Sequence, residues 1–132
     1  MSYTFTVLTP TYNRSHTLAN VYNCLVKQTL QEFEWLIVDD GSSDNTESLV
    51  KSWLETAPFL IRYFKKINGG KHTALNLGIE EAEGDFTVIL DSDDVIKDDC
   101  LERLLHHWLS IPEESREGFA GVTGLCVDQH NQ

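Results

Sequence analysis

The sequence has little cysteine, proline or basic charge. Its 132 residues include three cysteines and three prolines, and 10 Lys and Arg stand against 21 Asp and Glu. Three cysteines without a short paired spacing indicate neither a disulfide framework nor a zinc site, and this usage favours a reducing compartment. The formal net charge of −11 argues against nucleic acid as a partner, because phosphate backbones bind basic surfaces.

Long apolar runs are also missing. No run approaches the roughly 20 apolar residues of a membrane-spanning helix, and the first residues do not form a basic region followed by an apolar signal segment. We therefore expect a cytoplasmic protein without a membrane span, and leave open a peripheral membrane association of a longer protein. With 41% hydrophobic residues the chain can bury a core, so residues 1–132 are expected to form one domain.

Strand-like and helix-like segments alternate along the chain. β-branched and aromatic residues predict strands at 3–8, 33–38, 60–64, 86–90 and 119–127. Apolar residues at helical spacing predict four intervening helices, whose inward faces include Leu18, Leu25, Val50, Leu54, Ala74, Ile79, Leu105 and Leu109. This alternation predicts an α/β fold with a mostly parallel, Rossmann-like sheet and helices on both faces.

Several residues carry signals for helix ends. Asn13 or Ser15 is expected to cap the first helix, and Asp44 with Glu47 three residues later resembles a capping box for the second. Gly84 is well placed to end the third helix.

Some candidate site residues are better explained by the core or the surface. Trp35, Trp53 and Trp108 lie within apolar patterns and are expected in the core. His106 and His107 lie beside inward-facing positions of a helix and are expected at its surface or boundary.

The richest chemical signal lies in the stretch 86–94, where a buried strand ends in three carboxylates among four positions. Two carboxylates about 4 Å apart repel by roughly 4 kcal/mol at an effective dielectric near 20. Asp91 and Asp93 bracket Ser92, a spacing that can aim both carboxylates at a hard divalent cation such as Mg²⁺ or Mn²⁺. The alternative is that Asp93 or Asp94 caps the next helix or lies solvated in a turn.

Polar segments follow three of the expected strands, at 9–14, 39–47 and 91–94. In parallel α/β sheets, ligands bind beyond the carboxyl ends of the strands. We therefore expect these three segments to share one rim of the sheet.

Four segments, in this order, resemble the motifs of family 2 glycosyltransferases: Thr9-Pro10-Thr11-Tyr12-Asn13-Arg14, then 38–46, 76–85 and 90–94. The resemblance covers nearly the whole chain. It implies the GT-A fold type, a nucleotide-diphosphate sugar donor (UDP in the first instance), a Mn²⁺ or Mg²⁺ cofactor, inversion at the sugar carbon and a role in polysaccharide biosynthesis. One departure is Leu75, where the family often has arginine, and it weakens the case that this helix contacts phosphate.

The resemblance also implies roles for residues on the base side. Thr9 and Pro10 would approach the nucleotide by backbone or hydroxyl, and Tyr12 would pack on the base. Asp40 would accept from a uracil-type ring nitrogen, with Asp39 turned towards its own loop. The alternatives are that Tyr12 is a half-buried loop aromatic and that Asp40 caps the next helix.

On the diphosphate side, the resemblance implies that Asp91, with Ser92 beside it, holds the ribose and that Asp93 binds the metal. Arg14 and Lys71 are suited to phosphate, with simple surface charge as the alternative. His72 is expected either to contact the ligand or to belong to the start of a helix.

No carboxylate in the sequence can be assigned as the catalytic base. In the resembled family the base and the acceptor motif lie in a second half, beyond Gln132, so we expect a truncated domain that binds the donor only, with an unknown acceptor. Two other hypotheses stay open. One is a receiver-like phosphoacceptor domain, although its paired acids should follow the first strand, and the other is a non-catalytic binding module.

Overall fold

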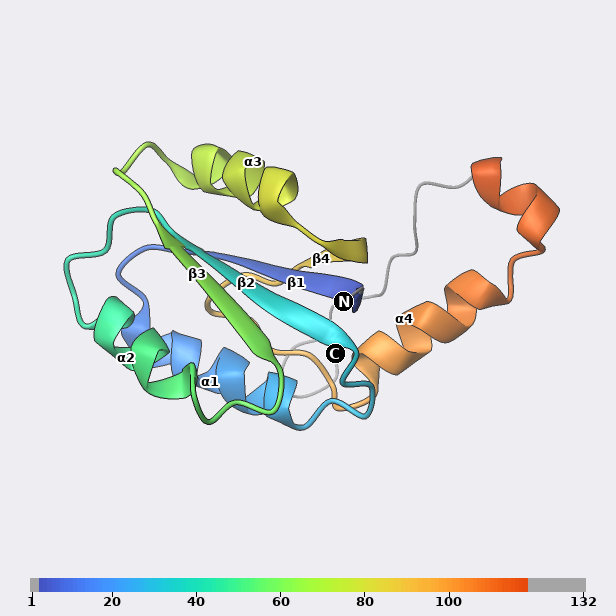
Figure 1. Ribbon diagram of the computed structural model, residues 1–132, viewed down its shortest axis with the longest axis horizontal. Coiled ribbons are helices and arrows are strands. Elements are labelled where there is room, and N and C mark those ends of the chain that lie inside the picture. Colours follow the sequence, from blue (N-terminus) through green and yellow to red (C-terminus); the bar gives the residue numbers. More distant parts are fainter. Residues whose placement is uncertain (1–2, 119–132) are drawn as a thin grey trace, which may run out of the picture.

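Four parallel strands form the sheet of this protein. The structure is a computed structural model that describes residues 3–118, and its strands are β1 (Tyr3–Thr11), β2 (Phe33–Asp39), β3 (Leu60–Lys65) and β4 (Gly84–Ile89). Their spatial order is β3-β2-β1-β4, and each neighbouring pair is parallel (Figure 1). The expected parallel sheet is confirmed, and the strand expected at 119–127 lies outside the described residues.

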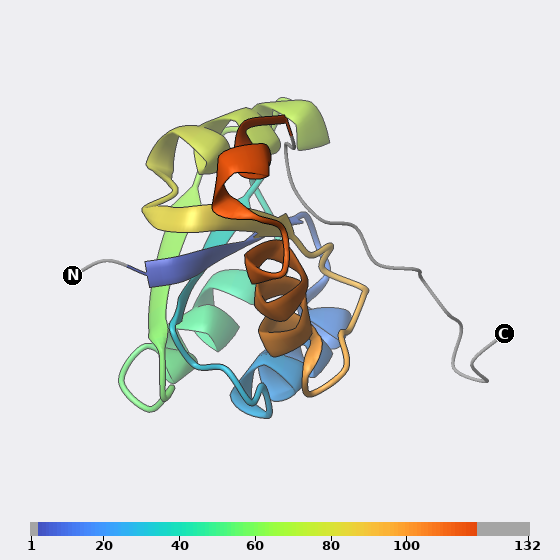
Figure 2. The ribbon, with the colours of Figure 1, turned by 90° about the vertical axis from the view of Figure 1, so that its right-hand side faces the viewer.

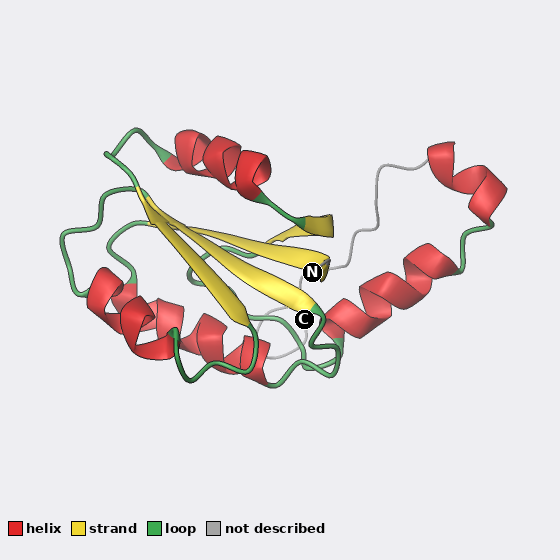
Figure 3. Ribbon diagram, viewed as in Figure 1, coloured by secondary structure: helices red, strands yellow, loops and turns green. Residues whose placement is uncertain are grey.

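Helices cover both faces of the sheet, as expected. α1 (Ser15–Val26) and α2 (Thr46–Trp53) lie against one face, and α3 (Lys71–Glu81) lies against the other (Figure 3). α4 (Cys100–Leu109) follows β4 on the side of α1, and a short 3₁₀ helix spans Glu113–Gly118 (Figure 2). Within residues 3–118, no helix is both long and apolar enough to cross a membrane.

The core is divided by the sheet into a larger and a smaller cluster. Alternating residues of β1 and β2, such as Val7 and Trp35, point towards α1 and α2 in the larger cluster. Leu8, Leu36 and Ala74 belong to the smaller cluster under α3. All seven residues of β2 are buried, because this strand lies inside the sheet and is covered on both faces.

The expected helix caps are wrong for both α1 and α2. Arg14 is the N-cap of α1 and makes no capping side-chain hydrogen bond. The side chain of Asn13 does not cap α1 but accepts the backbone N–H of Ser43 in another loop. The capping box of Asp44 and Glu47 does not form. Instead, Asp44 accepts from the backbone N–H of Thr46, only two residues further on.

Gly84 was expected to end α3. It begins β4 instead. The C-cap of α3 is Ala82, in an extended conformation. A Cβ at Gly84 would lie 2.4 Å from the backbone nitrogen of Thr6 and 2.5 Å from the carbonyl carbon of Phe5. Glycine is therefore required here by the close approach of β4 to β1, rather than by a helix end.

Two of the three tryptophans lie in the core as expected. Trp35 is fully buried and Trp53 nearly so, and the Trp53 ring stacks on Tyr22 with a centroid distance of 4.4 Å. Trp108 is only half-buried and packs edge-on against Phe86. α4 therefore covers the face of β4 only in part.

Helical spacing predicted too many inward positions near the helix ends. Leu54, Ile79 and Leu109 are 46%, 58% and 56% exposed, because no described element covers them. His106 and His107 are exposed, which confirms their expected surface position.

A buried ion pair fixes the connection between α3 and β4. Glu34 is fully buried in β2 and accepts hydrogen bonds from Arg62 Nη1 at 2.9 Å and from Thr6 Oγ1 at 2.8 Å. It also accepts the backbone N–H of Glu83 at 2.8 Å, and Arg62 reaches Glu81 at the end of α3. These contacts fix residues 81–83, which lead from α3 into β4, and removal of Arg62 would leave the Glu34 charge buried without its partner.

We predict that Gly84→Ala destabilises the chain by about 1–3 kcal/mol, because the new methyl group meets the backbone of β1. Urea unfolding followed by tryptophan fluorescence measures this change. Gly118→Ala is the matched control, since a Cβ there meets nothing within 4 Å, and its effect should stay within about 0.5 kcal/mol. Equal effects of the two substitutions would contradict the close approach of β4 to β1.

Candidate functional site

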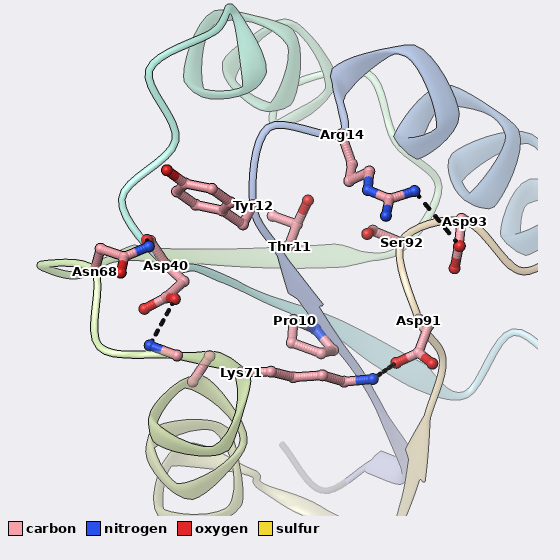
Figure 4. Close-up of a pocket in the computed structure, with 12 residues that line it drawn as sticks. Pro10, Thr11, Tyr12, Arg14, Asp40, Asn68, Lys71, Asp91, Ser92 and Asp93 are labelled. Atoms are coloured by element: carbon pink, nitrogen blue, oxygen red, sulfur yellow. Dashed lines mark hydrogen bonds and ion pairs between the residues drawn. The ribbon is translucent and has the colours of Figure 1, made fainter.

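A pocket opens at the rim of the sheet where β1, β2 and β4 end. Its volume is about 480 Å³, within the range of small-molecule sites, which is roughly 300–1,000 Å³. The residues that line it are Pro10, Thr11, Tyr12, Arg14, Asp40, Asn68, Gly70, Lys71, Ala74, Asp91, Ser92 and Asp93. The three polar segments that follow these strands therefore share one rim, as expected (Figure 4).

Three carboxylates gather on the β4 side of the pocket. One oxygen each of Asp91, Asp93 and Asp94 lies within 4.8 Å of the others. Burial raises the pKa of Asp94, and the neighbouring Asp93 and Asp91 raise it further. The cluster therefore repels itself, and a cation placed among these oxygens would relieve the repulsion.

Two cations from other elements reach this cluster across the pocket. Lys71 Nζ, at the start of α3, lies 2.8 Å from Asp91 Oδ1, and Arg14 Nη1, from the loop after β1, lies 3.5 Å from Asp93 Oδ2 (Figure 4). The side chains of Arg14 and Asp93 are about half exposed, so water screens this pair and its contribution to stability is small. Arg14 is therefore held only weakly at this wall, whereas Lys71 lies closer to its carboxylate partner.

The acidic residues fit a hard divalent cation. Asp91 Oδ1 is buried, and its charged partner among the described residues is Lys71 Nζ at 2.8 Å. Three carboxylates whose oxygens lie this close together are the kind of donor set that Mg²⁺ and Mn²⁺ prefer. Neither Asp93 nor Asp94 caps α4, whose N-cap is Asp99, but both are exposed and Asp93 lies in a turn, as the alternative of a solvated turn expects.

Asp40 organises the loop that precedes α3. Its side chain is nearly buried, and Oδ1 accepts from Lys66 Nζ at 2.8 Å and from the Gly69 N–H at 2.9 Å, while Oδ2 accepts the Gly70 N–H at 2.9 Å. Burial alone raises the pKa of Asp40, but these hydrogen bonds outweigh it and hold the pKa below its usual value. Asp40 therefore does not cap α2, and its ionised carboxylate faces the pocket from a rigid position.

The residues after β1 line the opposite wall. Pro10 and Tyr12 both face the pocket, and Tyr12 is 48% exposed. Thr9 lies outside the pocket: it is fully buried, and its hydroxyl accepts from Trp35 Nε1 at 2.9 Å. The expectation that the Thr9 hydroxyl approaches a ligand is therefore wrong, because alternation along β1 points this side chain into the core.

Sequence reasoning missed several residues of the site. Thr11 lines the pocket, and its buried hydroxyl oxygen has no hydrogen-bond partner among the described residues. Asn68 donates to the Asp40 carbonyl oxygen at 3.0 Å, and Lys66 holds the Asp40 carboxylate. The asparagine in a Gly-rich loop was a usable signal, whereas Lys66 is found only once β2 and β3 are known to be neighbours. His72 is exposed and does not line the pocket.

Comparison with protein families places this site in a known class. The family model described as glycosyl transferase family 2 matches residues 6–114, which include every residue that lines the pocket. The chain belongs to glycosyltransferase family 2. The resemblance of its motifs is thereby confirmed.

Curated family 2 relatives are considerably longer than this chain. It is 34% identical to the glycosyltransferase GlyG of Streptococcus pneumoniae over 104 residues, which cover 79% of this chain and 35% of that protein. It is 32% identical over 123 residues to the GalNAc(5)-diNAcBac-PP-undecaprenol beta-1,3-glucosyltransferase of Campylobacter jejuni, covering 92% of this chain and 37% of that protein. The chain thus spans about a third of the length of these relatives.

Solved family structures confirm the expected GT-A fold type. Staphylococcus aureus TarS 1-349 in complex with UDP matches with a TM-score of 0.72 and 29% identity, over 80% of this chain and 32% of that one. The mannosyltransferase PcManGT from Pyrobaculum calidifontis, in complex with GDP-Man and Mn²⁺, matches with a TM-score of 0.75 and 31% identity, over 83% of this chain and 33% of that one.

We predict that Asp40→Asn destabilises the chain by about 1–3 kcal/mol near pH 7, because the amide cannot accept the bonds from Lys66, Gly69 and Gly70 in the same way. The pKa of Asp40 is lowered on folding, so its contribution is present above the usual carboxyl pKa and is lost as the pH falls through the folded value.

Urea unfolding at several pH values tests this. The difference in stability between the natural chain and Asp40→Asn should shrink as the pH is lowered below about 4. Asp85→Asn, at an exposed position of β4, is the control and should show a small difference at every pH. A difference in stability between the natural chain and Asp40→Asn that grows as the pH falls would contradict an ionised Asp40 carboxylate that accepts these hydrogen bonds.

Proposed function

We propose that residues 1–132 form the donor-binding part of a metal-dependent glycosyltransferase, which binds a nucleotide-diphosphate sugar and transfers the sugar, with inversion, to an acceptor that we leave unidentified. UDP is the first choice of nucleotide. A role in polysaccharide biosynthesis forms part of the proposal. It rests on family membership and on the name of one relative, the minor teichoic acid biosynthesis protein GgaB of Bacillus subtilis.

The observation that carries this proposal is that one pocket has a cluster of carboxylates on one side and an aromatic ring with a further carboxylate on the other. Asp91, Asp93 and Asp94 gather their oxygens on one side, and Tyr12 and Asp40 face the pocket from the ends of β1 and β2. An aromatic ring and a carboxylate acceptor suit a nucleobase with a ring N–H, and a carboxylate cluster suits a cation that carries a diphosphate. A nucleoside diphosphate has both parts.

Each group in the pocket has a role in this proposal. Tyr12 packs on the base, Asp40 accepts from its ring nitrogen, and the backbone at Pro10 borders it. Asp91, with the nearly buried Ser92 beside it, holds the ribose. Thr9 supports this wall from within the core.

The diphosphate is the group that carries charge as the sugar leaves. Asp93 would hold a Mn²⁺ or Mg²⁺ ion, which when bound neutralises charge that develops on the leaving nucleoside diphosphate. Lys71 and Arg14 would exchange their carboxylate partners for phosphate oxygens, because their present ion pairs are partly exposed and weak.

The acceptor and the catalytic base are proposed to lie with residues beyond this sequence. Among residues 3–118, the acids that line the pocket are Asp40, Asp91 and Asp93, and all three have donor-binding roles in this proposal. The alternative, a non-catalytic nucleotide-binding module, uses the same pocket. Acceptor-dependent release of UDP from a UDP-sugar, measured on a protein that carries this domain together with the proposed base and acceptor-binding residues, distinguishes the two.

We predict that UDP raises the melting temperature of the chain in the presence of Mn²⁺ and much less after addition of a chelator. The physical reason is the net charge of −11 and the acidic wall, which oppose a diphosphate that no cation bridges. Thermal shift measures this, with GDP and dTDP as comparisons for the base. Equal stabilisation by UDP with and without chelator would contradict the metal role of Asp93.

We predict that Asp93→Asn abolishes the Mn²⁺-dependent part of UDP binding and leaves the unliganded chain equally stable or slightly more stable. One charge is removed from a self-repelling cluster, and the lost ion pair with Arg14 is half exposed. Calorimetric titration and thermal melting measure the two effects. Asp98→Asn, an exposed acid outside the pocket, is the control. A fall of several degrees for unliganded Asp93→Asn would show that this residue holds the fold instead.

A further inference from the structure

Asn13 lies between two residues of the pocket but does not line it. Tyr12 and Arg14 face the pocket on either side of it. The backbone of Asn13 has φ +53°, in the left-handed region that asparagine tolerates better than other residues with a Cβ. This conformation turns the chain sharply between the end of β1 and the start of α1.

Asn13 ties this turn to the loop that follows β2. Its backbone N–H donates to Ser42 Oγ at 2.8 Å, and its side-chain Oδ1 accepts the backbone N–H groups of Ser43 at 2.8 Å and of Asp44 at 3.3 Å. In the same pair of loops, Asp44 Oδ2 accepts the backbone N–H of Ser15 at 3.2 Å. Hydrogen bonds thus run in both directions between two loops about 30 residues apart in sequence.

The loop after β2 is itself anchored in the core. Asp39 is fully buried and accepts the backbone N–H of Ser42 at 2.8 Å, and its other oxygen accepts from the hydroxyl of Tyr63 on β3. Burial raises the pKa of Tyr63, and the nearby Asp39 carboxylate raises it further, so the phenol stays protonated and donates. The expectation that Asp39 turns towards its own loop is confirmed. A continuous set of contacts therefore leads from β3 to Asn13.

Packing does little to orient the two neighbours of Asn13. Tyr12 is 48% exposed, and the side chain of Arg14 is 49% exposed with one ion pair at 3.5 Å. The backbone of this turn therefore sets where each side chain begins and which way its Cα–Cβ bond points. That backbone is held by Asn13.

We propose that Asn13 is a positioning residue of the donor site, which holds Tyr12 for the base and Arg14 for the diphosphate without touching the ligand. This inference rests on the proposed function of the pocket. If Asn13 has this role, part of the affinity for the nucleotide depends on the hydrogen bonds between the loop after β1 and the loop after β2. The cation site on the β4 side is linked to this contact only through the half-exposed pair of Arg14 with Asp93, because Asn13 itself has no hydrogen bond to that wall among the described residues.

The test compares Asn13→Gly with three other variants. Asn13→Gly tolerates φ +53° but removes the amide, Ser42→Ala removes the acceptor of the Asn13 N–H, and Asn13→Asp keeps a side-chain acceptor. Ser43→Ala is the matched control, because it removes only the hydroxyl at 3.4 Å and keeps the backbone N–H.

Calorimetric titration with UDP and Mn²⁺ is the first readout. Asn13→Gly and Ser42→Ala should each weaken UDP binding by about tenfold, the equivalent of one or two lost hydrogen bonds. Asn13→Asp should recover most of the affinity, and Ser43→Ala should match the natural chain. Binding of Mn²⁺ alone, followed by electron paramagnetic resonance, should change much less than UDP binding in all four, because only the half-exposed Arg14–Asp93 pair links Asn13 to the cation site. Equal weakening of UDP and Mn²⁺ binding would show general destabilisation and overturn the proposal.

Amide hydrogen exchange of the ligand-free chain is the second readout, and it needs no nucleotide. Asn13→Gly should speed exchange at 12–15 and 42–44 and leave the loop 66–70 unchanged. If the natural chain binds none of UDP, GDP and dTDP in the presence of Mn²⁺, the proposed function is wrong, and the exchange data still decide whether Asn13 holds the two loops. Unchanged exchange at 12–15 would overturn the inference.

Discussion

The parallel pairing of β1 with β2 and β4 is the constraint on which the site depends. Because these strands run in the same direction, the residues that follow each of them reach the same rim of the sheet. The ladder continues just past the strand ends, where the Asp40 N–H donates to the Thr11 carbonyl and the Leu90 N–H to the Leu8 carbonyl. A shift of one residue in the pairing of β2 would move each of its side chains to the opposite face of the sheet, so the register is firmly set.

The ion pairs at this rim join side chains from different elements rather than from the same loop. The carboxylates after β2 and β4 find their cations on other elements: Lys66 follows β3, Lys71 begins α3 and Arg14 follows β1. The Lys66 pair is mostly buried and structural, whereas the Arg14 and Lys71 pairs are exposed enough to be exchanged. The same rim therefore contains a rigid part, around Asp40, and a part that can rearrange around an incoming diphosphate.

Much of the fold could be predicted from the sequence, because hydrophobic period and strand-forming composition are local properties. The errors lie where a local signal had a distant cause. Gly84 has the pattern of a helix end, yet it is required by the backbone of β1. Asn13 and Asp44 have the pattern of helix caps, yet both are used between loops. Leu109 has the spacing of an inward residue, but no element among the described residues covers it.

The sequence by itself determined the α/β class, the shared rim of the polar segments and the family. The reason is that the order of the motifs and the spacing of apolar residues can be read directly from the chain. Only the tertiary structure decided which groups meet there. It turned Thr9 into the core, paired Asp40 with Lys66, and tied Asn13 to the loop after β2. These contacts join residues about 26 to 31 positions apart. Their partners depend on strand order and on loop geometry, which no local pattern contains.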